Sequence, residues 1–382
     1  MKNISHQNLF RRTRAFTLVE ILVSLAVLTI LLLINAQVIG QVQATWSASN
    51  ARVSQFREAR TAFDIITRNL SQATLNTYLD YENNYLLTAG PTSGGVATAA
   101  TNPGSYRRKS DLQFRCGDAS DLVPAGGGAP YLPGHAVFFQ APLGVTENPL
   151  YVGLDKLLCA RGYFVQFSSD EAFRPSILPQ GDFRYRYRLM EYSPPAEKNQ
   201  IFSLPAPTDG TVPDGWHVDA GGAINADSED AEDIGTTRPI ADNIIALIIS
   251  PRREFRATAA NGLSQDSDDD DTVDIAPQYA YNSNSTVGSS ALLPQGNQFL
   301  LPPLVRVVLV AIDEKSAERI SLEQGGDSTP PFGASLHSPF DSSSATDLDT
   351  SISQLVEILN TRRINYRVFS ATVQLRGAKW SI

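Results

Sequence analysis

An uncharged apolar run near the amino terminus constrains this 382-residue chain more than any other feature. No charged residue occurs between positions 21 and 51, and residues 21–39 are mostly Leu, Ile, Val and Ala. As a helix rising about 1.5 Å per residue, that stretch covers about 28 Å, close to the hydrocarbon thickness of a bilayer. Four basic residues and no acid precede it, namely Lys2, Arg11, Arg12 and Arg14. Since basic flanks stay on the cytoplasmic side, the pattern predicts one membrane helix with the remaining chain translocated.

Two simpler explanations of the run leave something out. A cleaved signal peptide has an apolar region of about 7–15 residues followed by a small-residue cleavage site. This run is longer, although Val42-Gln43-Ala44 could serve as such a site. A plain membrane anchor leaves Glu20 unexplained, because a carboxylate at the edge of an apolar span costs about 1–3 kcal/mol and is functional by default.

The segment Arg14-Ala15-Phe16-Thr17-Leu18-Val19-Glu20 and the apolar run after it carry a resemblance. They resemble the class III signal of type IV prepilins and type II secretion pseudopilins. The resemblance implies that a membrane peptidase cuts between Ala15 and Phe16, and that the new amino terminus at Phe16 is N-methylated. Most members of the family have Gly where this chain has Ala15, which is also small.

Glu20 gains a role from the same resemblance. Cleavage would create an α-amine with a reference pKa near 8 at Phe16, and methylation would keep its charge. A carboxylate buried nearby needs a cationic partner. In fibres of such proteins this Glu is thought to pair with the amine of a neighbouring subunit, so Glu20 would register one subunit against the next.

The apolar pattern continues past the membrane as an amphipathic helix. Its stripe falls close to a 3.5-residue spacing, as a coiled coil or a helix packed on a sheet would show. It comprises Val42, Trp46, Ser49, Val53, Phe56, Arg60, Phe63 and Leu70, thickened by Ile65 and Ile66. We therefore expect an α+β, pilin-like fold, with a long amino-terminal helix packed on an antiparallel β-sheet head. The expected parts are a leader at 1–15, a transmembrane helix at 16–39, an amphipathic helix at 40–80 and a head at 81–382.

Strand-like segments alternate with loops in the head. Strands are expected at 111–116, 136–140, 157–167, 183–192, 240–250, 303–313 and 365–379, with a helix at 351–362. In the strand at 183–192, aromatic side chains face one way and Arg184, Arg186 and Arg188 face the other. The arginines are expected to form a solvated ridge or a surface for an acidic partner. The order of segments from Ile240 onward resembles J-type minor pseudopilins and pilus-tip proteins. The overall pattern is also similar to a prepilin-like family, cassette protein C, found in multigene cassettes of verrucomicrobial genomes and without known activity.

Four long segments rich in Gly, Pro, Ser or Asp interrupt these elements. They lie at 88–105, 194–237, 257–298 and 324–350. Loops of this length are uncommon inside a domain, so we expect disorder or specialised surface there.

One of these loops holds the strongest metal candidate. Asp266, Asp268 and Asp270 place carboxylates at alternate positions, as calcium prefers. As an EF-hand, however, Asp271 would stand where Gly is needed and Pro277 where Glu is needed. A solvated acidic run is the competing interpretation, and it also fits the second acidic run at 227–233.

Catalytic patterns are scarce in the sequence. Cys116 and Cys159 would lie in an oxidising compartment after translocation and could form a disulfide. His135, His217 and His337 are each isolated in a loop-like context without metal-ligand spacing. Phosphate-binding, dinucleotide-binding and serine-hydrolase motifs are absent from the sequence. We therefore expect no enzyme and no cofactor, with a membrane-anchored hydrolase as the rival class.

The charge balance completes the functional prediction. The chain has 31 Lys and Arg against 40 Asp and Glu, which argues against nucleic-acid binding. Removing residues 1–15 takes away four basic residues and no acid, so the net charge falls from −9 to −13. We expect a minor pseudopilin with an inner-membrane stem and an acidic periplasmic head, or one in a surface fibre. Its expected partners are prepilin peptidase, other pilins or pseudopilins and the assembly platform. A tip adhesin is the alternative.

Overall fold

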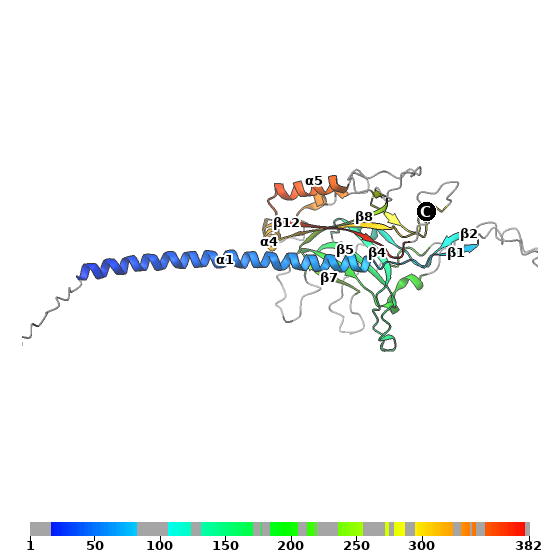
Figure 1. The fold of residues 1–382 in the computed structure, drawn as a ribbon, viewed down its shortest axis with the longest axis horizontal. Helices are drawn as coiled ribbons and strands as arrows, with labels where there is room; N and C mark the ends of the chain where they lie inside the picture. The colour runs from blue at the N-terminus through cyan, green and yellow to red at the C-terminus, as the bar shows by residue number, and fades with distance from the viewer. Residues whose placement is uncertain are drawn as a thin grey trace, which may run out of the picture. The chain divides into compact units, whose positions relative to one another are not determined.

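The computed structural model describes most of the head and the amino-terminal helix (Figure 1). The described residues are 17–81, 106–123, 131–170, 177, 184–204, 212–217, 220, 236–254, 272–274, 279–286, 295–323, 330–336, 338–340 and 348–378. The chain divides into two compact units, Met1–Ser54 and Gln55–Ile382. We refer to the second unit as the head.

Helix α1, Leu18–Leu70, begins in the first unit and ends in the second. It contains no proline, and its one glycine is Gly40. Leu and Ala are its two commonest residues, and both lose little side-chain freedom in a helix. A continuous helix therefore forms through both the apolar run and the amphipathic segment, as the sequence predicts. It ends at Leu70 and not at residue 80, because the chain turns there and enters β1 at Tyr78.

The strands of the head form three antiparallel sheets. A two-stranded sheet pairs β1 (Tyr78–Tyr81) with β2 (Tyr106–Lys109). A six-stranded sheet has the order β10-β3-β4-β5-β6-β7, with bounds Tyr281–Asn282, Arg115–Asp118, His135–Pro142, Leu158–Ser168, Arg186–Tyr192 and Thr237–Asp242. A four-stranded sheet has the order β12-β11-β8-β9, with bounds Tyr366–Gln374, Leu304–Ile312, Ile244–Glu254 and Thr272–Asp274.

The two larger sheets pack on each other through β8, which lies against β4, β5 and β6. Strands β4 and β8 read as nearly continuous apolar runs because residues on both of their faces are buried. The approach is close at Gly134, where a Cβ would lie 2.7 Å from the carbonyl oxygen of Leu247. Gly134 also has a φ of +72°, so glycine is required at this crossing for two reasons.

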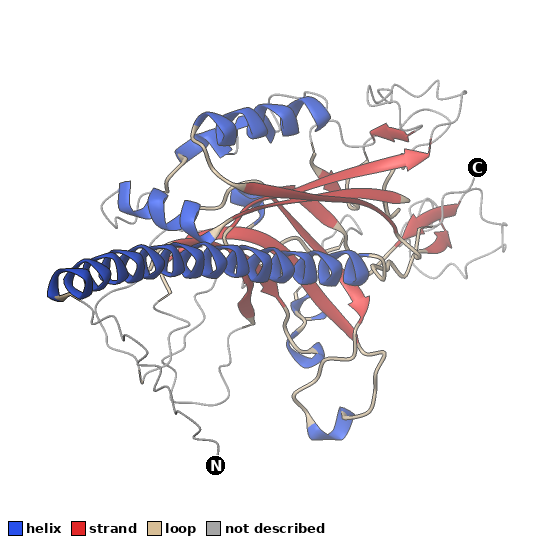
Figure 2. Ribbon diagram, turned by 60° about the vertical axis from the view of Figure 1, so that its left-hand side comes forward, coloured by secondary structure: helices blue, strands red, loops and turns tan. Residues whose placement is uncertain are grey.

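The carboxyl-terminal part of α1 completes the core, crossing the strands in Figure 2. Its buried apolar side chains are Ala59, Ala62, Phe63, Ile66 and Leu70. The ring of Phe63 lies 6.0 Å from that of Phe369 in β12. The predicted stripe is therefore confirmed at Phe63, Ile66 and Leu70. It is wrong at Arg60, which is exposed, because the small Ala59 and Ala62 allow the closer approach to the sheets.

Two further helices flank the four-stranded sheet (Figure 1). Helix α5, Leu348–Thr361, buries Leu355 and Leu359, and its Asp349 accepts from Arg306 of β11 at 2.9 Å. Helix α4, Glu314–Glu323, follows β11 directly and was not expected from the sequence. Short helical turns complete the described head: α3 (Ala119–Leu122), η1 (Pro149–Tyr151), η3 (Ala196–Lys198), η4 (Gln200–Phe202), η6 (Gly333–Leu336) and η7 (Ser338–Phe340).

The expected fold class is confirmed: the protein is α+β, with a long amino-terminal helix and a head rich in antiparallel sheet. The expected strands appear as β3 to β8, β11 and β12, and the expected helix as α5. At the boundary between β7 and β8, Asn243 has a φ of +58°. This left-handed residue turns the chain from the six-stranded sheet into the four-stranded one.

The basic ridge expected on the strand at 183–192 is wrong. Arg188 is buried and lies 3.3 Å from Asp242, its cross-strand neighbour. Arg186 forms a bidentate pair with the carboxylate of Glu314 in α4. The same carboxylate accepts a hydrogen bond from the side-chain amide of Asn243 at 2.7 Å. Both guanidinium groups therefore hold elements of the head together. Of the three, Arg184 is exposed.

Three of the four expected loops contribute to the core. Each places a fully or almost fully buried aromatic side chain there: Trp216 from 194–237, Tyr279 from 257–298 and Phe340 from 324–350. Aromatic burial of this size fixes a polar segment to the domain. The segment 257–298 also contributes two short strands, β9 and β10, which were not expected. The loop at 88–105 lies outside the described residues.

Candidate functional site

The amino-terminal end of α1 is the first candidate site, and it is organised by Thr17. The backbone carbonyl of Thr17 accepts from the amides of Glu20 and Ile21 at 3.1 and 3.3 Å. Its hydroxyl oxygen also accepts from the Glu20 amide at 3.4 Å. Thr17 is thus the N-cap, and Thr-x-x-Glu is the sequence of a capping box.

Glu20 therefore lies in the first turn of the helix, exposed to the surroundings. A negative charge is favourable there because the helix macrodipole is positive at its amino-terminal end. The Thr-x-x-Glu pattern is visible in the sequence and would have predicted that the helix begins at Thr17. The resemblance alone explained Glu20 only by its role between subunits. Ala15 and Phe16 lie outside the described residues, so the cleavage site between them stays a prediction.

An apolar segment, Leu18–Ser47, follows directly and is long and apolar enough to cross a membrane. Within Met1–Ser54, every described side chain of this segment is exposed, large aliphatic residues such as Leu28 and Leu32 included. A helix that is apolar on all sides and covered by no protein is typical of a membrane span. This segment fits a membrane anchor.

Four polar side chains of the apolar segment bond back to their own helix. Ser24 donates to the carbonyl of Ile21 at 2.8 Å, and Asn35 to that of Leu31 at 2.9 Å. Thr29 and Thr45 make bonds of the same kind, to Ala26 and Gln41. Each of these polar groups thus has a partner that hydrocarbon could not provide.

The end of α1 in the head carries a different polar arrangement. The amide of Asn69, which is buried, donates to the hydroxyl of Tyr163 in β5 at 2.8 Å. Tyr163 in turn donates to the carboxylate of Glu191 in β6 at 2.9 Å. Burial raises the pKa of Tyr163, so the phenol keeps the proton it donates. Arg161 and Arg238 lie 3.9 and 3.4 Å from the same carboxylate and balance its charge.

A second contact fixes the point where α1 enters the head. The carboxylate of Glu58 accepts from the backbone amide of Asp242 at 3.2 Å. Burial raises the pKa of Glu58, and the carboxylates of Asp242 and Glu314 raise it further, against that hydrogen bond. Neither contact could be predicted from the sequence, because the partners of Asn69 and Glu58 lie far along the chain.

The expected disulfide is absent, since Cys116 and Cys159 are both buried free thiols. Cys116 pairs in register with Val137 of β4, and Cys159 pairs with Ala141 on the other side of β4. The two cysteines are thus separated by two strand spacings and four residues, or about 10 Å across and 13 Å along the sheet. A disulfide needs Cα atoms within about 7 Å, so this pair cannot form in the native register.

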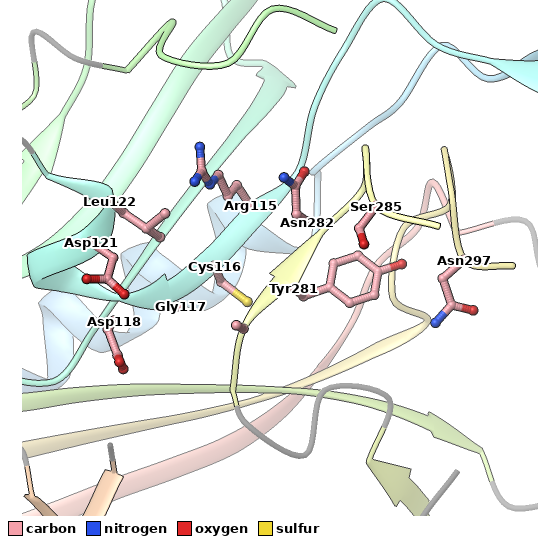
Figure 3. Close-up of a pocket in the computed structure, with 11 residues that line it drawn as sticks. Arg115, Cys116, Gly117, Asp118, Asp121, Leu122, Tyr281, Asn282, Ser285 and Asn297 are labelled. Carbon is pink, nitrogen blue, oxygen red and sulfur yellow. The ribbon is translucent and has the colours of Figure 1, made fainter. Parts of the chain in front are cut away.

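A pocket of about 410 Å³ lies where β10 pairs with β3, and Cys116 lines it (Figure 3). Asp118 and Asp121 lie at one end of the view, and Tyr281 and Asn297 at the other. Burial raises the pKa of the Cys116 thiol to about 12, so it remains protonated and is a poor nucleophile. The pocket therefore lacks an activated nucleophile among its described lining residues.

The calcium candidates cannot be placed, since Asp266, Asp268 and Asp270 lie outside the described residues. Asp274, at the end of the same acidic run, lies in β9 opposite Arg252 of β8. In the described part of the chain, no group of three or more His, Cys, Asp or Glu side chains could hold a metal ion.

Of the three histidines that follow the predicted leader, two prove to be core residues rather than loop residues. His135 begins β4, and its Nδ1 accepts from the backbone amide of Ile249 in β8 at 3.0 Å. His217 stacks on Phe138 with ring centroids 4.4 Å apart. Burial lowers the pKa of His217 to about 4, with the charge of Arg115 acting in the same direction. His337 lies outside the described residues.

Comparison with known families finds a match at the site built by Thr17 and Glu20. Residues 10–34 match the family described as the prokaryotic N-terminal methylation motif. The match includes Ala15, Phe16 and Glu20 and stops before the head. No curated protein and no solved structure matches the chain. The protein therefore carries the class III signal of type IV pilin-like proteins, joined through one long helix to an antiparallel β-rich head.

Proposed function

We propose that this protein is a minor pseudopilin or similar prepilin-like structural subunit of an envelope-spanning fibre or secretion machine. The methylation motif at residues 10–34, together with an apolar helix whose described side chains are all exposed, is the observation that supports this role. The helix holds the subunit in the inner membrane until an assembly platform adds it to a fibre. The head then lies in the periplasm or on a surface fibre. J-type pseudopilins and cassette protein C are the subfamilies its sequence resembles.

In this proposal, prepilin peptidase cleaves between Ala15 and Phe16 and methylates the new amine. The positive amine then lies one residue before the N-cap Thr17, where the helix macrodipole disfavours a cation. Glu20, in the first turn, offsets that charge in the subunit, or pairs with the amine of a neighbouring subunit in the fibre. The role is structural and needs no cofactor, and calcium binding at the run from Asp266 to Asp270 stays a prediction.

The tip-adhesin alternative loses one of its two expected surfaces. Its basic ridge would have used Arg186 and Arg188, which are bound to Glu314 and Asp242 inside the head. No described contact favours a ligand-binding head over a structural one, so we propose the structural role alone.

Intact-mass measurement of the membrane-extracted protein tests the proposal. We expect a chain that starts at N-methylated Phe16. Ala15→Gly, which restores the residue common in the family, should be processed at least as completely, whereas Ala15→Leu should stay uncleaved. A chain that starts at Met1 or at Thr45 would contradict the proposal.

The role of Glu20 requires a separate measurement. Glu20→Ala should be processed normally, because cleavage precedes Phe16, yet should enter fibres poorly. Glu20→Asp keeps the charge and serves as the matched control. Normal assembly of Glu20→Ala would show that the carboxylate acts only on its own helix.

A further inference from the structure

Strand β12 forms a long and unprotected edge of the four-stranded sheet. In the described part of the chain, the four-stranded sheet ends at β12 and β9, and the six-stranded sheet at β10 and β7. Strands β9 and β10 have only three and two residues, and β7 contains Pro239 and a register shift against β6. Strand β12 has nine residues without proline or glycine, in continuous register with β11. Because proteins usually protect an edge of this length with charges, proline or a bulge, an open one indicates a place for a partner strand.

The hydrogen bonds at the two ends of β12 show which of its backbone groups face outward. The amide of Asp313 donates to the carbonyl of Asn365 at 3.1 Å, and the amide of Leu375 donates to the carbonyl of Pro303 at 3.1 Å. Antiparallel partners bond at alternate residues, so the odd-numbered residues between these ends bond to β11. The even-numbered residues direct their amides and carbonyls away from β11, namely Tyr366, Val368, Ser370, Thr372 and Gln374. Among the described residues, no other group bonds to these amides and carbonyls.

The neighbouring helices leave this edge open. On one face of the sheet, the ring of Phe369 lies 6.0 Å from that of Phe63 in α1. On the other face, Arg306, which stands opposite Thr372 in register, bonds to α5. Both helices therefore cover faces of the four-stranded sheet and not its edge (Figure 1). Ser370 and Thr372 are accordingly exposed.

The surroundings of β12 are positively charged, in contrast to the chain as a whole. Residues 358–382 contain four arginines, one lysine and no acid, whereas the whole chain has a net charge of −9. Arg363 and Arg367, at the start of β12, are exposed and form no ion pair with a described acid. Arg319 of α4 adds a cation at the same end by donating to the carbonyl of Arg363 at 3.0 Å. The charge at this edge therefore favours an acidic partner.

We propose that the outward edge of β12 binds an extended acidic segment of a partner protein, which adds a fifth strand to the four-stranded sheet. Strand addition takes its affinity from main-chain hydrogen bonds and its specificity from alternate side chains. Here the even-numbered residues supply the main-chain bonds, and Arg363 and Arg367 select Asp or Glu. The inference goes beyond the proposed function, since it depends neither on cleavage at Ala15 nor on assembly into a fibre.

A second copy of this chain is a poorer occupant of the edge. It would bring the same basic residues to the interface, where like charges repel. Direction opposes it as well. Phe63 lies against Phe369, and the carbonyl of Ser71 accepts from the amide of Arg376 at 3.1 Å, so α1 and β12 run in the same general direction in the head. Antiparallel pairing of two β12 edges would turn the two helices in opposite directions, which copies anchored through α1 in one membrane could not adopt.

Binding of a defined peptide to the detergent-solubilised full chain tests the proposal. The probe is a fluorescently labelled peptide as long as β12, nine residues, in which Thr or Val alternates with Glu. The control peptide has Lys in place of every Glu. Ser370→Pro removes one outward amide and leaves the bonds to β11 in place, and Ser370→Ala is its matched control.

We expect the acidic peptide to bind, with an affinity that falls as salt rises, and the basic peptide not to bind. Ser370→Pro should weaken binding about tenfold, whereas Ser370→Ala should bind as the native chain does. Arg367→Gln should weaken binding about threefold and reduce the dependence on salt, and Arg367→Lys should keep both.

Hydrogen exchange of the native chain gives a second readout that needs no variant. Bound peptide should slow exchange at the outward amides of Val368, Ser370 and Thr372. The amides of Phe369 and Ala371, which bond to β11, should exchange as slowly with the peptide as without it.

Four results would overturn the proposal. The first is failure of the acidic peptide to bind, and the second is equal binding of the acidic and basic peptides. The third is binding that leaves the amides of Val368, Ser370 and Thr372 unprotected, because the peptide would then lie elsewhere. The fourth is protection of these amides in the chain alone together with a doubled mass in solution, because a second copy would then occupy the edge.

Discussion

The two parts of helix α1 have the same backbone geometry but suit different surroundings. In Leu18–Ser47 apolar side chains point in every direction and none is buried. From Gln55 to Leu70 the apolar side chains keep to one face, and that face is buried. The distribution of apolar residues around the helix, rather than helix propensity, thus decides whether a segment is suited to lipid or to a protein core.

The polar residues of α1 differ in the same way. In the apolar part, Asn35 bonds to its own helix backbone four residues earlier. In the head, Asn69 bonds to Tyr163 in another element. A local bond satisfies a polar group wherever the helix lies, whereas a tertiary bond also fixes the helix to its partner.

Truncation of the buried face should give the largest effect. Ile66→Ala should lower the free energy of unfolding of the head by about 2–5 kcal/mol, since Ile66 is fully buried. Ile34→Ala, which is the same change in the apolar part, should leave head unfolding unchanged. Thermal unfolding of the detergent-solubilised full chain, followed by near-UV circular dichroism, measures both. Equal effects would show that the two parts do not differ as described.

An introduced charge should harm the apolar segment of α1 more than the part of α1 in the head. Leu32→Arg places a guanidinium inside the apolar segment and should disfavour insertion by about 2.5–3.5 kcal/mol. Thr61→Arg, on the exposed face in the head, should insert normally. The measurement is the fraction of protein resistant to alkaline extraction from membranes. Full membrane retention of Leu32→Arg would argue against a span through this residue.

The two asparagines should differ by a smaller amount. Asn69→Ala leaves the hydroxyl of Tyr163 without its donor and should cost about 1–3 kcal/mol of head stability. Asn35→Ala removes only a local bond and should be close to neutral. Unfolding of both variants under the conditions used for Ile66→Ala gives the comparison. A neutral Asn69→Ala would show that the bond to Tyr163 contributes nothing to holding α1 on the sheet.

Glu58 should make head stability depend on pH. Its pKa is raised in the folded head, so its contribution is complete below the unfolded value near 4.5 and is lost as pH rises through the folded value. Glu58→Gln keeps an acceptor for the Asp242 amide and removes the charge. At neutral pH this variant should be more stable than the native chain by less than about 1 kcal/mol, because the side chain is only partly buried and solvent screens its charge. The difference should disappear in acid, and a constant difference would rule out Glu58 as its source.

The sequence predicted the parts of the fold that depend on local pattern. The apolar run produced α1, and the apolar segments near 136–140, 240–250 and 303–313 became β4, β8 and β11. The class III signal was recognised from seven residues because its chemistry is carried by neighbours in the chain. These features need no knowledge of which segments meet in space.

Tertiary pairing decided the features that were missed. Alternation in β6 predicted a solvated arginine ridge, but Arg186 meets Glu314, which is 128 positions later. The cysteines could have paired because both were expected in an oxidising compartment, yet β4 lies between their strands. Trp216 stands in a Gly- and Pro-rich segment without helical or strand periodicity. No sequence pattern therefore predicted that its side chain would be buried.

The N-cap of α1 should give the smallest effect, and it separates the two roles of the first turn. Thr17→Ala removes the hydroxyl that accepts from the Glu20 amide, a long bond of 3.4 Å, and should cost about 0.5 kcal/mol of local helix stability. The readout is faster hydrogen exchange at the amides of Glu20 and Ile21, with head unfolding unchanged. Thr17→Ser keeps the acceptor and should exchange like the native chain. Because Thr17 carries no charge, its loss should leave any charge-dependent assembly role of Glu20 intact. If Thr17→Ala blocked fibre entry as strongly as Glu20→Ala, the assembly defect would come from an unravelled first turn and not from a missing carboxylate.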